Sequence, residues 1–385
     1  MIHEPLCDPV RQGPHLECAL AQMPLAEEYE IATMFFMWSA ACLTPLLPVV
    51  WFLLPLPRIA SAVLAGLIVL SCTWPCGDWP VPPKRRWQMC VPCRPTFVLL
   101  PASSLPPTQT PACDEHPPRR LALNRLAVVS RRPLRNQQTC SAFLRYFPMR
   151  CILESEGAVL HEDRPMILAG VPHGLFPIGM LCLSLANCML PFRWTRGAAA
   201  SITLRLPIWR QVLGWNGGIE VSRKAIKSAL TEGDNVAVMS DGIAGMFAAD
   251  AGMRTGKEVI VLKKRRGLVR IALETGSPLV PFVCLGNTKA CLPATDRFGI
   301  MEALSRMLGA SFIWPAGRWG LPIPYRTPIT VVIGAPLLSP CSEPIPSPPE
   351  AMVDAMHEQL MSEVSAMYYR WRNVAGYAGV ELEII

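Results

Sequence analysis

The sequence predicts an α/β domain over residues 143–385, preceded by a membrane-embedded hairpin over residues 31–77. From residue 143 onward, short runs rich in β-branched residues alternate with helix signals, which is typical of α/β domains. Upstream, residues 31–57 and 59–77 carry no charged side chain. Since about 20 apolar residues suffice to span a bilayer, these runs predict a membrane hairpin. A buried core hairpin is the alternative.

The prolines between residues 45 and 57 prevent the first uncharged run from continuing as a regular helix, so a segment that enters and returns fits better than two independent spans. Lys84, Arg85 and Arg86 follow the hairpin, and this basic flank predicts that the C-terminal bulk faces the cytosol. The expected organisation is therefore a polar tail, the hairpin, a linker and the α/β domain, over residues 1–30, 31–77, 78–142 and 143–385.

The expected linker, residues 78–142, is basic and rich in proline. Its central part, residues 87–138, lacks apolar periodicity and predicts disorder, because it cannot bury enough apolar area to offset the entropy of ordering. Two origins stay open for this part: a lineage-specific loop, or a retained intron. Most of the net charge of +7 comes from this stretch, which argues against nucleic acid as a partner.

Within the α/β domain, two helices have clear start signals. Ser222 predicts a cap for a helix that ends at Gly233, and Ser347 stands three residues before Glu350, at capping-box spacing. Apolar residues recur at helical period from Val353 to Trp371. The expected strands cover residues 165–171, 235–240, 258–262, 279–285 and 329–334.

The fifteen cysteines do not indicate a metal site. Cys90 and Cys93 form a CxxC pair with no second pair or histidine pair at zinc spacing, so we expect no metal. Several others, such as Cys182 and Cys284, stand inside apolar runs, where a thiol behaves as a small hydrophobic group. We expect reduced thiols.

One histidine stands out as a candidate catalytic residue. The chain has no G-x-S-x-G, Walker A, HExxH or GxGxxG motif. Of the six histidines, His173 alone follows a predicted strand at a turn, between Pro172 and Gly174. An imidazole there is suited to take a proton from a hydroxyl. His3 and Asp8 also match an H-x4-D pattern, but they lie in the polar tail without a strand before them, and we attribute the match to chance.

Four blocks in order resemble the type 2 diacylglycerol acyltransferase family. Val171-Pro172-His173-Gly174 is similar to its x-P-H-G block, and "GGIEVSR" resembles a second block. The remaining two are "RRGLVRIALETGSPLVPFVCLG" and "GRWGLPIPYRTPI". The sequence departs from the family at Val171, where His or Glu is frequent, and at Gly245, where the family has Glu.

The resemblance implies a glycerolipid-acyltransferase-like mixed sheet flanked by helices, and an acyl-CoA-dependent transfer of a fatty acyl group to diacylglycerol. It implies that His173 is the general base and that backbone N–H groups near Gly174, at the start of the following helix, stabilise the oxyanion. Asp241 is expected to supply the carboxylate missing at Gly245, and Glu220 is a second candidate partner for His173. The expected substrate-binding residues are Pro172, Asp241, Arg223, Arg266 and Arg318, with Arg266 favoured over its basic neighbours for the phosphates of coenzyme A.

No cofactor is expected besides acyl-CoA as co-substrate, and the expected partners are acyl-CoA, diacylglycerol and the lipid bilayer. The family places the chain in the endoplasmic reticulum membrane, with lipid droplets as a further location. A homo-oligomer is a further open alternative. The uncharged run 174–192 has two interpretations: a helix in the core of the domain, or a helix embedded in one leaflet of the membrane. Alternative functions are transfer to monoacylglycerol, a long-chain alcohol or a sterol, or a non-catalytic role on lipid droplets.

Overall fold

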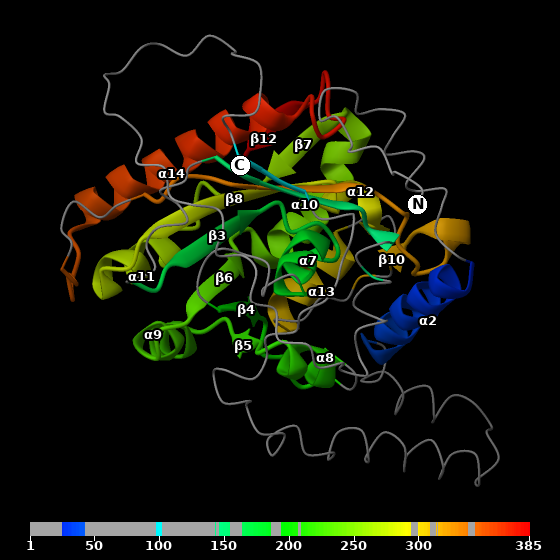
Figure 1. Ribbon diagram of the computed structural model, residues 1–385, viewed down its shortest axis with the longest axis horizontal. Coiled ribbons are helices and arrows are strands. Elements are labelled where there is room, and N and C mark those ends of the chain that lie inside the picture. Colours follow the sequence, from blue (N-terminus) through cyan, green and yellow to red (C-terminus); the bar gives the residue numbers. More distant parts are fainter. Residues whose placement is uncertain are drawn as a thin grey trace, which may run out of the picture.

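The structure is a computed structural model in which helices cover both faces of a central sheet (Figure 1). It describes residues 25–42, 98–101, 143, 146–154, 164–185, 194–206, 209–293, 299–308, 313, 315–337 and 343–385.

Among the described residues, eight strands form one sheet in the order β1-β2-β11-β8-β3-β6-β4-β5. Neighbouring strands are parallel except β8 and β11, which are antiparallel, so the sheet is mixed as expected. Their bounds are β1 Val98–Pro101, β2 Met149–Leu153, β3 Ile167–Val171, β4 Thr195–Ala199, β5 Ile219–Glu220, β6 Asn235–Met239, β8 Leu279–Leu285 and β11 Ile329–Ile333.

The central strands bury both faces, and alternate side chains enter two different cores. Leu168 packs on one side with residues of α7 (Ile178–Leu185) and with Trp209, the first residue of α8 (Trp209–Trp215). Ala169 packs on the other side with α9 (Arg223–Thr231), α11 (Gly267–Thr275) and α14 (Glu350–Trp371). This two-sided burial explains why β3, β6 and β8 are continuous apolar runs.

The remaining elements complete the layers. Strand β7 (Lys257–Ile260) pairs in parallel with β12 (Glu381–Ile384) in a separate small sheet, and β9 (Leu292–Pro293) pairs antiparallel with β10 (Pro315–Ala316). The other helices are α10 Gly242–Thr255, α12 Asn287–Ala290, α13 Ile300–Leu308 and the 3₁₀ turn η5 Arg318–Gly320.

The two helix starts that the sequence predicted have different outcomes. The Ser222 side chain accepts from Ala225 N–H at 3.3 Å, which confirms it as the cap of α9. The capping box at Ser347 is wrong: α14 begins at Glu350, and Pro349 before it has an extended ψ of 142° without a side-chain cap. Proline also holds the residue before it extended, so Pro348 and Pro349 together delay the start of the helix.

Helix α2 (Leu25–Cys42) crosses the expected boundary at residue 30 between the polar tail and the hairpin. Ile31 and Phe35 are fully buried in the core of the α/β domain, and the Phe35 and Phe176 rings lie 5.4 Å apart. In Figure 1, α2 (blue) lies at the lower right, below β10. The helices that the structure describes include none long and apolar enough to cross a membrane. The rest of the expected hairpin, 43–77, lies outside the described residues.

Four residues of the expected linker are also placed. Residues 98–101 form β1, which pairs in parallel with β2 at one end of the sheet. These residues, Val-Leu-Leu-Pro, begin with a β-branched side chain and lack charge, so they suit an edge strand better than the disordered segment that the proline content predicted.

Candidate active site

The candidate site lies at the carboxyl ends of three adjacent parallel strands, β8, β3 and β6. His173 follows β3 in the middle, Asp241 follows β6 on one side, and Asn287 follows β8 on the other. In α/β sheets, this edge is where ligands usually bind. The fold thus brings together three polar side chains that are far apart in the chain.

His173 is half-buried and its backbone is fixed. Its backbone N–H donates to Asp241 Oδ2 at 2.8 Å. Its Nδ1 lies 2.8 Å from the Gly174 carbonyl oxygen. Because a carbonyl can only accept, Nδ1 carries the proton and the Nε2 lone pair is left for another partner. No described residue hydrogen-bonds to Nε2.

Asp241 is fully buried and supports the turn through the main chain rather than through the imidazole. Burial raises the pKa of its carboxyl, while the His173 charge, the hydrogen bond from the His173 backbone and the Arg265 charge lower this pKa. Its Oδ1 has no hydrogen-bond partner in the described part of the chain. The expected carboxylate is therefore present, but it contacts the backbone of His173.

The missing side chain at Gly245 has a physical reason. A Cβ atom at this position would lie 2.2 Å from Asp241 Oδ2 and 2.8 Å from Asp241 Cβ. The carboxylate that holds the His173 N–H therefore occupies the space that a side chain at residue 245 needs. A side chain at residue 245 and the present position of the Asp241 carboxylate therefore exclude each other.

Gly174 is the expected oxyanion residue. Its φ is +62°, and a Cβ there would lie 2.8 Å from the Asn287 carbonyl oxygen, so only glycine fits. The expectation that it starts a helix is wrong: α7 begins at Ile178, because Pro177 holds the residue before it extended. Within the described residues, the Gly174 N–H has no hydrogen-bond partner, so it can donate to an oxyanion although it is not part of a helix N-terminus.

The residue that sequence reasoning missed is Asn287. It is 1% exposed, and its Oδ1 accepts from the Gly179 backbone N–H at 2.8 Å. Its Nδ2 donates to the Pro172 carbonyl at 3.0 Å and lies 3.5 Å from the His173 carbonyl. The sequence feature that could have indicated Asn287 is its position shortly after a buried strand, directly following Gly286. His173 has a similar position after its own strand.

The three expected substrate-binding arginines are engaged in ion pairs elsewhere. Arg223 pairs with Glu274, whose side chain is 2% exposed, in the last turn of α11. The chain then enters β8 at its amino end. This ion pair therefore lies at the amino ends of the parallel strands, whereas His173 lies at their carboxyl ends.

The other two arginines bind neighbouring helices. Arg266 pairs with Asp354 of α14 at 2.9 Å, and Arg318 pairs with Glu28 of α2. The cation whose charge reaches the site is instead Arg265, which lowers the pKa of Asp241 and has an exposed side chain.

Glu220 is also not at the site. It accepts from the Ser201 hydroxyl and lies in the edge strand β5, so it is not a partner of His173. Pro172 is buried and enters the site through its carbonyl, which accepts from Asn287.

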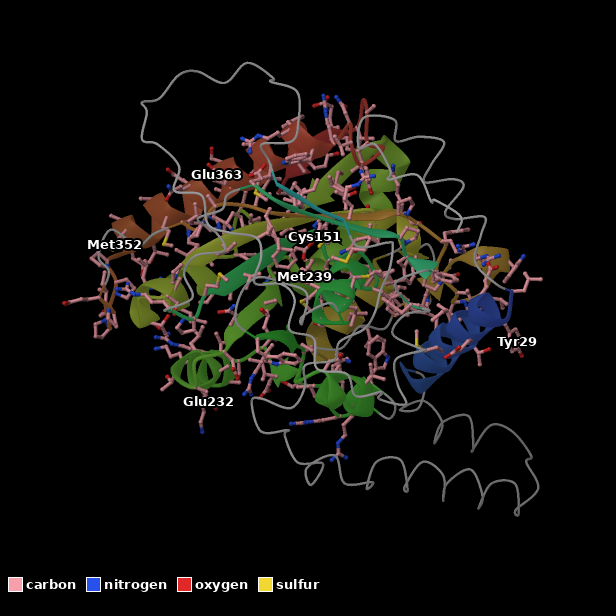
Figure 2. The ribbon with its side chains drawn as sticks, in the orientation of Figure 1. Tyr29, Cys151, Glu232, Met239, Met352 and Glu363 are labelled. Atoms are coloured by element: carbon pink, nitrogen blue, oxygen red, sulfur yellow. The ribbon has the colours of Figure 1, made fainter. Side chains whose placement is uncertain are left out.

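No group of His, Cys, Asp and Glu suited to hold a metal ion occurs among the described side chains. Cys182 and Cys284 are free and buried, as expected from their apolar surroundings, and so are Cys151 and Cys291. Burial raises the pKa of Cys151 to about 12. In Figure 2, Cys151 lies inside the molecule, whereas Tyr29 projects from its surface.

The chain matches the model of the diacylglycerol acyltransferase family over residues 122–384. It is 26% identical to diacylglycerol O-acyltransferase 2 of Xenopus tropicalis, over 66% of this chain and 73% of that protein. It is 25% identical to human 2-acylglycerol O-acyltransferase 3, over 63% of this chain and 74% of the relative.

Among solved structures, it resembles the 1-acyl-sn-glycerophosphate acyltransferase of Thermotoga maritima with a TM-score of 0.35 and 16% identity, over 60% of this chain and 81% of the other. The family match covers more than half of the chain and includes the His173 turn with both of its supports. The chain therefore belongs to the diacylglycerol acyltransferase family.

Proposed function

We propose that this chain transfers a fatty acyl group from acyl-CoA to the free hydroxyl of diacylglycerol, with His173 as the general base. The observation that carries the proposal is the orientation of His173, whose Nδ1 is used by the Gly174 carbonyl so that Nε2 keeps its lone pair. Family membership and the relatives named above support the substrate class.

In the proposed reaction, Nε2 removes the proton from the acceptor hydroxyl as its oxygen attacks the thioester carbonyl carbon. The new C–O bond forms, and the tetrahedral intermediate collapses with cleavage of the C–S bond. The imidazolium then returns its proton to the departing thiolate, which leaves as coenzyme A. The Asp241 carboxylate, bound to the His173 backbone, stabilises the transient positive charge of the ring.

The oxyanion of the intermediate is assigned to the Gly174 N–H. This group lies next to the base and has no partner among the residues described. A backbone donor fixed in advance stabilises a developing charge without reorganisation. Because Asn287 packs against Gly174, the donor is held in place.

For the anionic groups of acyl-CoA, the structure favours Arg265 over Arg223, Arg266 and Arg318. Those three arginines are held by carboxylates. Arg265 is exposed, and no ion pair involving its side chain occurs in the described part of the chain. A guanidinium is well suited to bind phosphate oxygens in pairs.

Retention on the endoplasmic reticulum membrane is the second part of the proposal, with the catalytic domain facing the cytosol. Since Ile31 and Phe35 belong to the core, the membrane-binding part is assigned to residues 43–77. Removing 43–77 should reduce the fraction of protein that sediments with microsomes, while turnover with dispersed substrate persists. Unchanged sedimentation after this deletion would assign membrane binding to other residues.

The decisive experiment uses microsomes that contain the chain, labelled acyl-CoA, and separate additions of diacylglycerol, monoacylglycerol, a long-chain alcohol and a sterol. We expect labelled triacylglycerol, and none with His173→Ala. Product from a different acceptor alone would keep the fold and base but change the acceptor, as the relationship to 2-acylglycerol O-acyltransferase 3 permits. No product from any acceptor would favour the non-catalytic role on lipid droplets.

A further inference from the structure

The side chain of Asn287 uses both ends of its amide at the candidate site. Its oxygen accepts from Gly179 N–H in α7 at 2.8 Å, and its nitrogen donates to the Pro172 carbonyl at 3.0 Å. It therefore joins the two sides of the Pro172–Pro177 turn. A buried amide that binds one donor and one acceptor fixes both partners, because losing either bond leaves a buried group unsatisfied.

We propose that Asn287 is a positioning residue, which acts on the reaction by fixing the main chain of the His173 turn at Pro172 before the histidine and at Gly179 after it. Asp241 fixes the N–H of His173, and Asn287 fixes the carbonyl of the residue before it. With both held, the direction of the imidazole depends on its own side-chain rotation and on the Nδ1 bond to Gly174. This inference rests on the proposed role of His173 as base.

Asn287 is itself held from behind by a second group of buried polar contacts. The Gly286 N–H donates to the Tyr377 hydroxyl at 3.0 Å, and the Thr288 hydroxyl donates to Glu258 at 3.0 Å. Gly286 has φ +111°, and a Cβ there would lie 2.3 Å from the Pro328 carbonyl oxygen. Residues on both sides of Asn287 are thus fixed, so its amide cannot follow a displaced His173 turn.

The substitution Asn287→Asp separates a positioning role from general stability. It keeps an oxygen for the Gly179 N–H but replaces the donor with a carboxylate oxygen, which faces the Pro172 carbonyl and repels it. Protonation restores a donor, because a neutral carboxyl has an O–H group. Burial raises the pKa of such a carboxyl, so donor recovery is expected as the pH falls toward neutrality.

We expect Asn287→Asp to lower turnover per folded molecule about ten- to a hundredfold at about pH 8. Its turnover relative to the natural chain should rise several-fold by about pH 6 as the carboxyl protonates. Asn287→Ala should lose activity without this acid recovery, with kcat reduced and the KM for acyl-CoA little changed. If Asn287→Asp fails to fold, the kcat and KM of Asn287→Ala carry the test.

Asn235→Asp is the matched control. Asn235 is also fully buried, and its Oδ1 accepts from Met166 N–H at 3.0 Å, at the opposite end of β3. The substitution Asn235→Asp introduces a buried carboxyl beside β3, as Asn287→Asp does. A general loss of stability would therefore affect both variants. The relative turnover of Asn235→Asp per folded molecule should not depend on pH.

The rate at which diethyl pyrocarbonate modifies His173, followed by mass spectrometry, reads the position of the ring without turnover. This rate should change in Asn287→Asp and Asn287→Ala but not in Asn235→Asp. If His173→Ala stays active while the modification rates of Asn287→Asp and Asn287→Ala still differ from that of the natural chain, the proposed function fails, and Asn287 fixes the His173 ring without a role in the reaction. Normal turnover of Asn287→Asp at about pH 8, or a modification rate equal to that of the natural chain, would overturn the positioning role.

Discussion

The carboxylate of Asp241 accepts the backbone N–H of His173, and the amide of Asn287 donates to the carbonyl of Pro172. Within the described residues, the imidazole hydrogen-bonds to one group, the Gly174 carbonyl, which fixes its Nδ1 proton. The Gly174 carbonyl is therefore sufficient to select the tautomer in which Nε2 keeps its lone pair. At the residue scale, the supports of this site act on the main chain.

Gly245→Ala tests whether the space beside Asp241 matters. The new Cβ would meet the Asp241 carboxylate at 2.2 Å, so that carboxylate must move away from the His173 N–H. We expect turnover to fall about ten- to a hundredfold, because small displacements of a catalytic group are costly. Stability should fall by about 1–3 kcal/mol, as for other overpacked sites. Turnover per folded molecule and thermal unfolding measure the two effects.

Gly214→Ala is the control, since nothing lies within 4 Å of a Cβ at Gly214 in α8. It should leave turnover unchanged. Equal turnover of Gly245→Ala and Gly214→Ala would show that the Asp241 carboxylate need not stay where the structure places it.

His173 was predicted because it follows a recognisable strand at a turn, and Asp241 because it stands in the block where the resemblance implies a carboxylate. The structure brings these two residues together. The sequence did not predict the ion pairs of Arg223, Arg266 and Arg318. A basic side chain in a family-like block looks the same whether its partner is a substrate phosphate or a carboxylate from another element. Only the fold decides between them, since all three carboxylates are far from the arginines in sequence.

Helix α2 packs on the α/β domain, although its composition predicts a membrane segment. An uncharged apolar run predicts a membrane segment, but the same composition suits a helix buried against a domain. Phe35 packs against the rings of Phe143, Phe147 and Phe176. Phe176 stands three residues after His173, so α2 supports the catalytic domain directly.

Phe35→Ala should therefore destabilise the α/β domain by about 3–5 kcal/mol, the usual cost of removing a buried phenylalanine. Leu25→Ala is the control on the same helix, because Leu25 is 82% exposed. Thermal unfolding of the two variants in detergent measures the difference. Equal stabilities would mean that α2 does not pack on the domain in solution.

Helix ends were predicted less well than helix faces. The buried face of α14 from Val353 to Trp371 is as predicted, because apolar periodicity records which side meets the sheet. The ends of α7 and α14 were placed too early, since Pro177, Pro348 and Pro349 hold the chain extended before each start. Of the run 174–192, residues 178–185 form a core helix.

At the scale of the whole molecule, Glu258 links global stability to pH. It is 5% exposed, and burial raises the pKa of its carboxyl from 4.5 to about 7. The folded state therefore binds this proton more tightly than the unfolded state does. The stabilising contribution of the proton is fully present below about pH 4.5 and is lost as the pH rises through about 7.

Glu258→Gln removes this titration and keeps an oxygen for the Thr288 hydroxyl. The free energy of unfolding of the natural chain, relative to Glu258→Gln, should decrease by on the order of 3 kcal/mol between the two pKa values. Denaturant unfolding at a series of pH values measures it. Glu363→Gln on α14 (Figure 2) is the control and should show no such trend. A relative stability that rises with pH would contradict the burial of the Glu258 carboxyl.

In the proposed reaction, His173 takes a proton from the acceptor hydroxyl. Turnover per folded molecule of His173→Ala, His173→Gln and His357→Gln tests this role. His357 is the control because it is a buried histidine on α14 whose ring binds the Leu262 carbonyl at 3.0 Å, outside the site. Both His173 variants should lose activity at least about a hundredfold, since glutamine hydrogen-bonds but is not a base, while His357→Gln stays active once folded. Near-normal turnover of His173→Gln would contradict the account, since the histidine would then only position substrate.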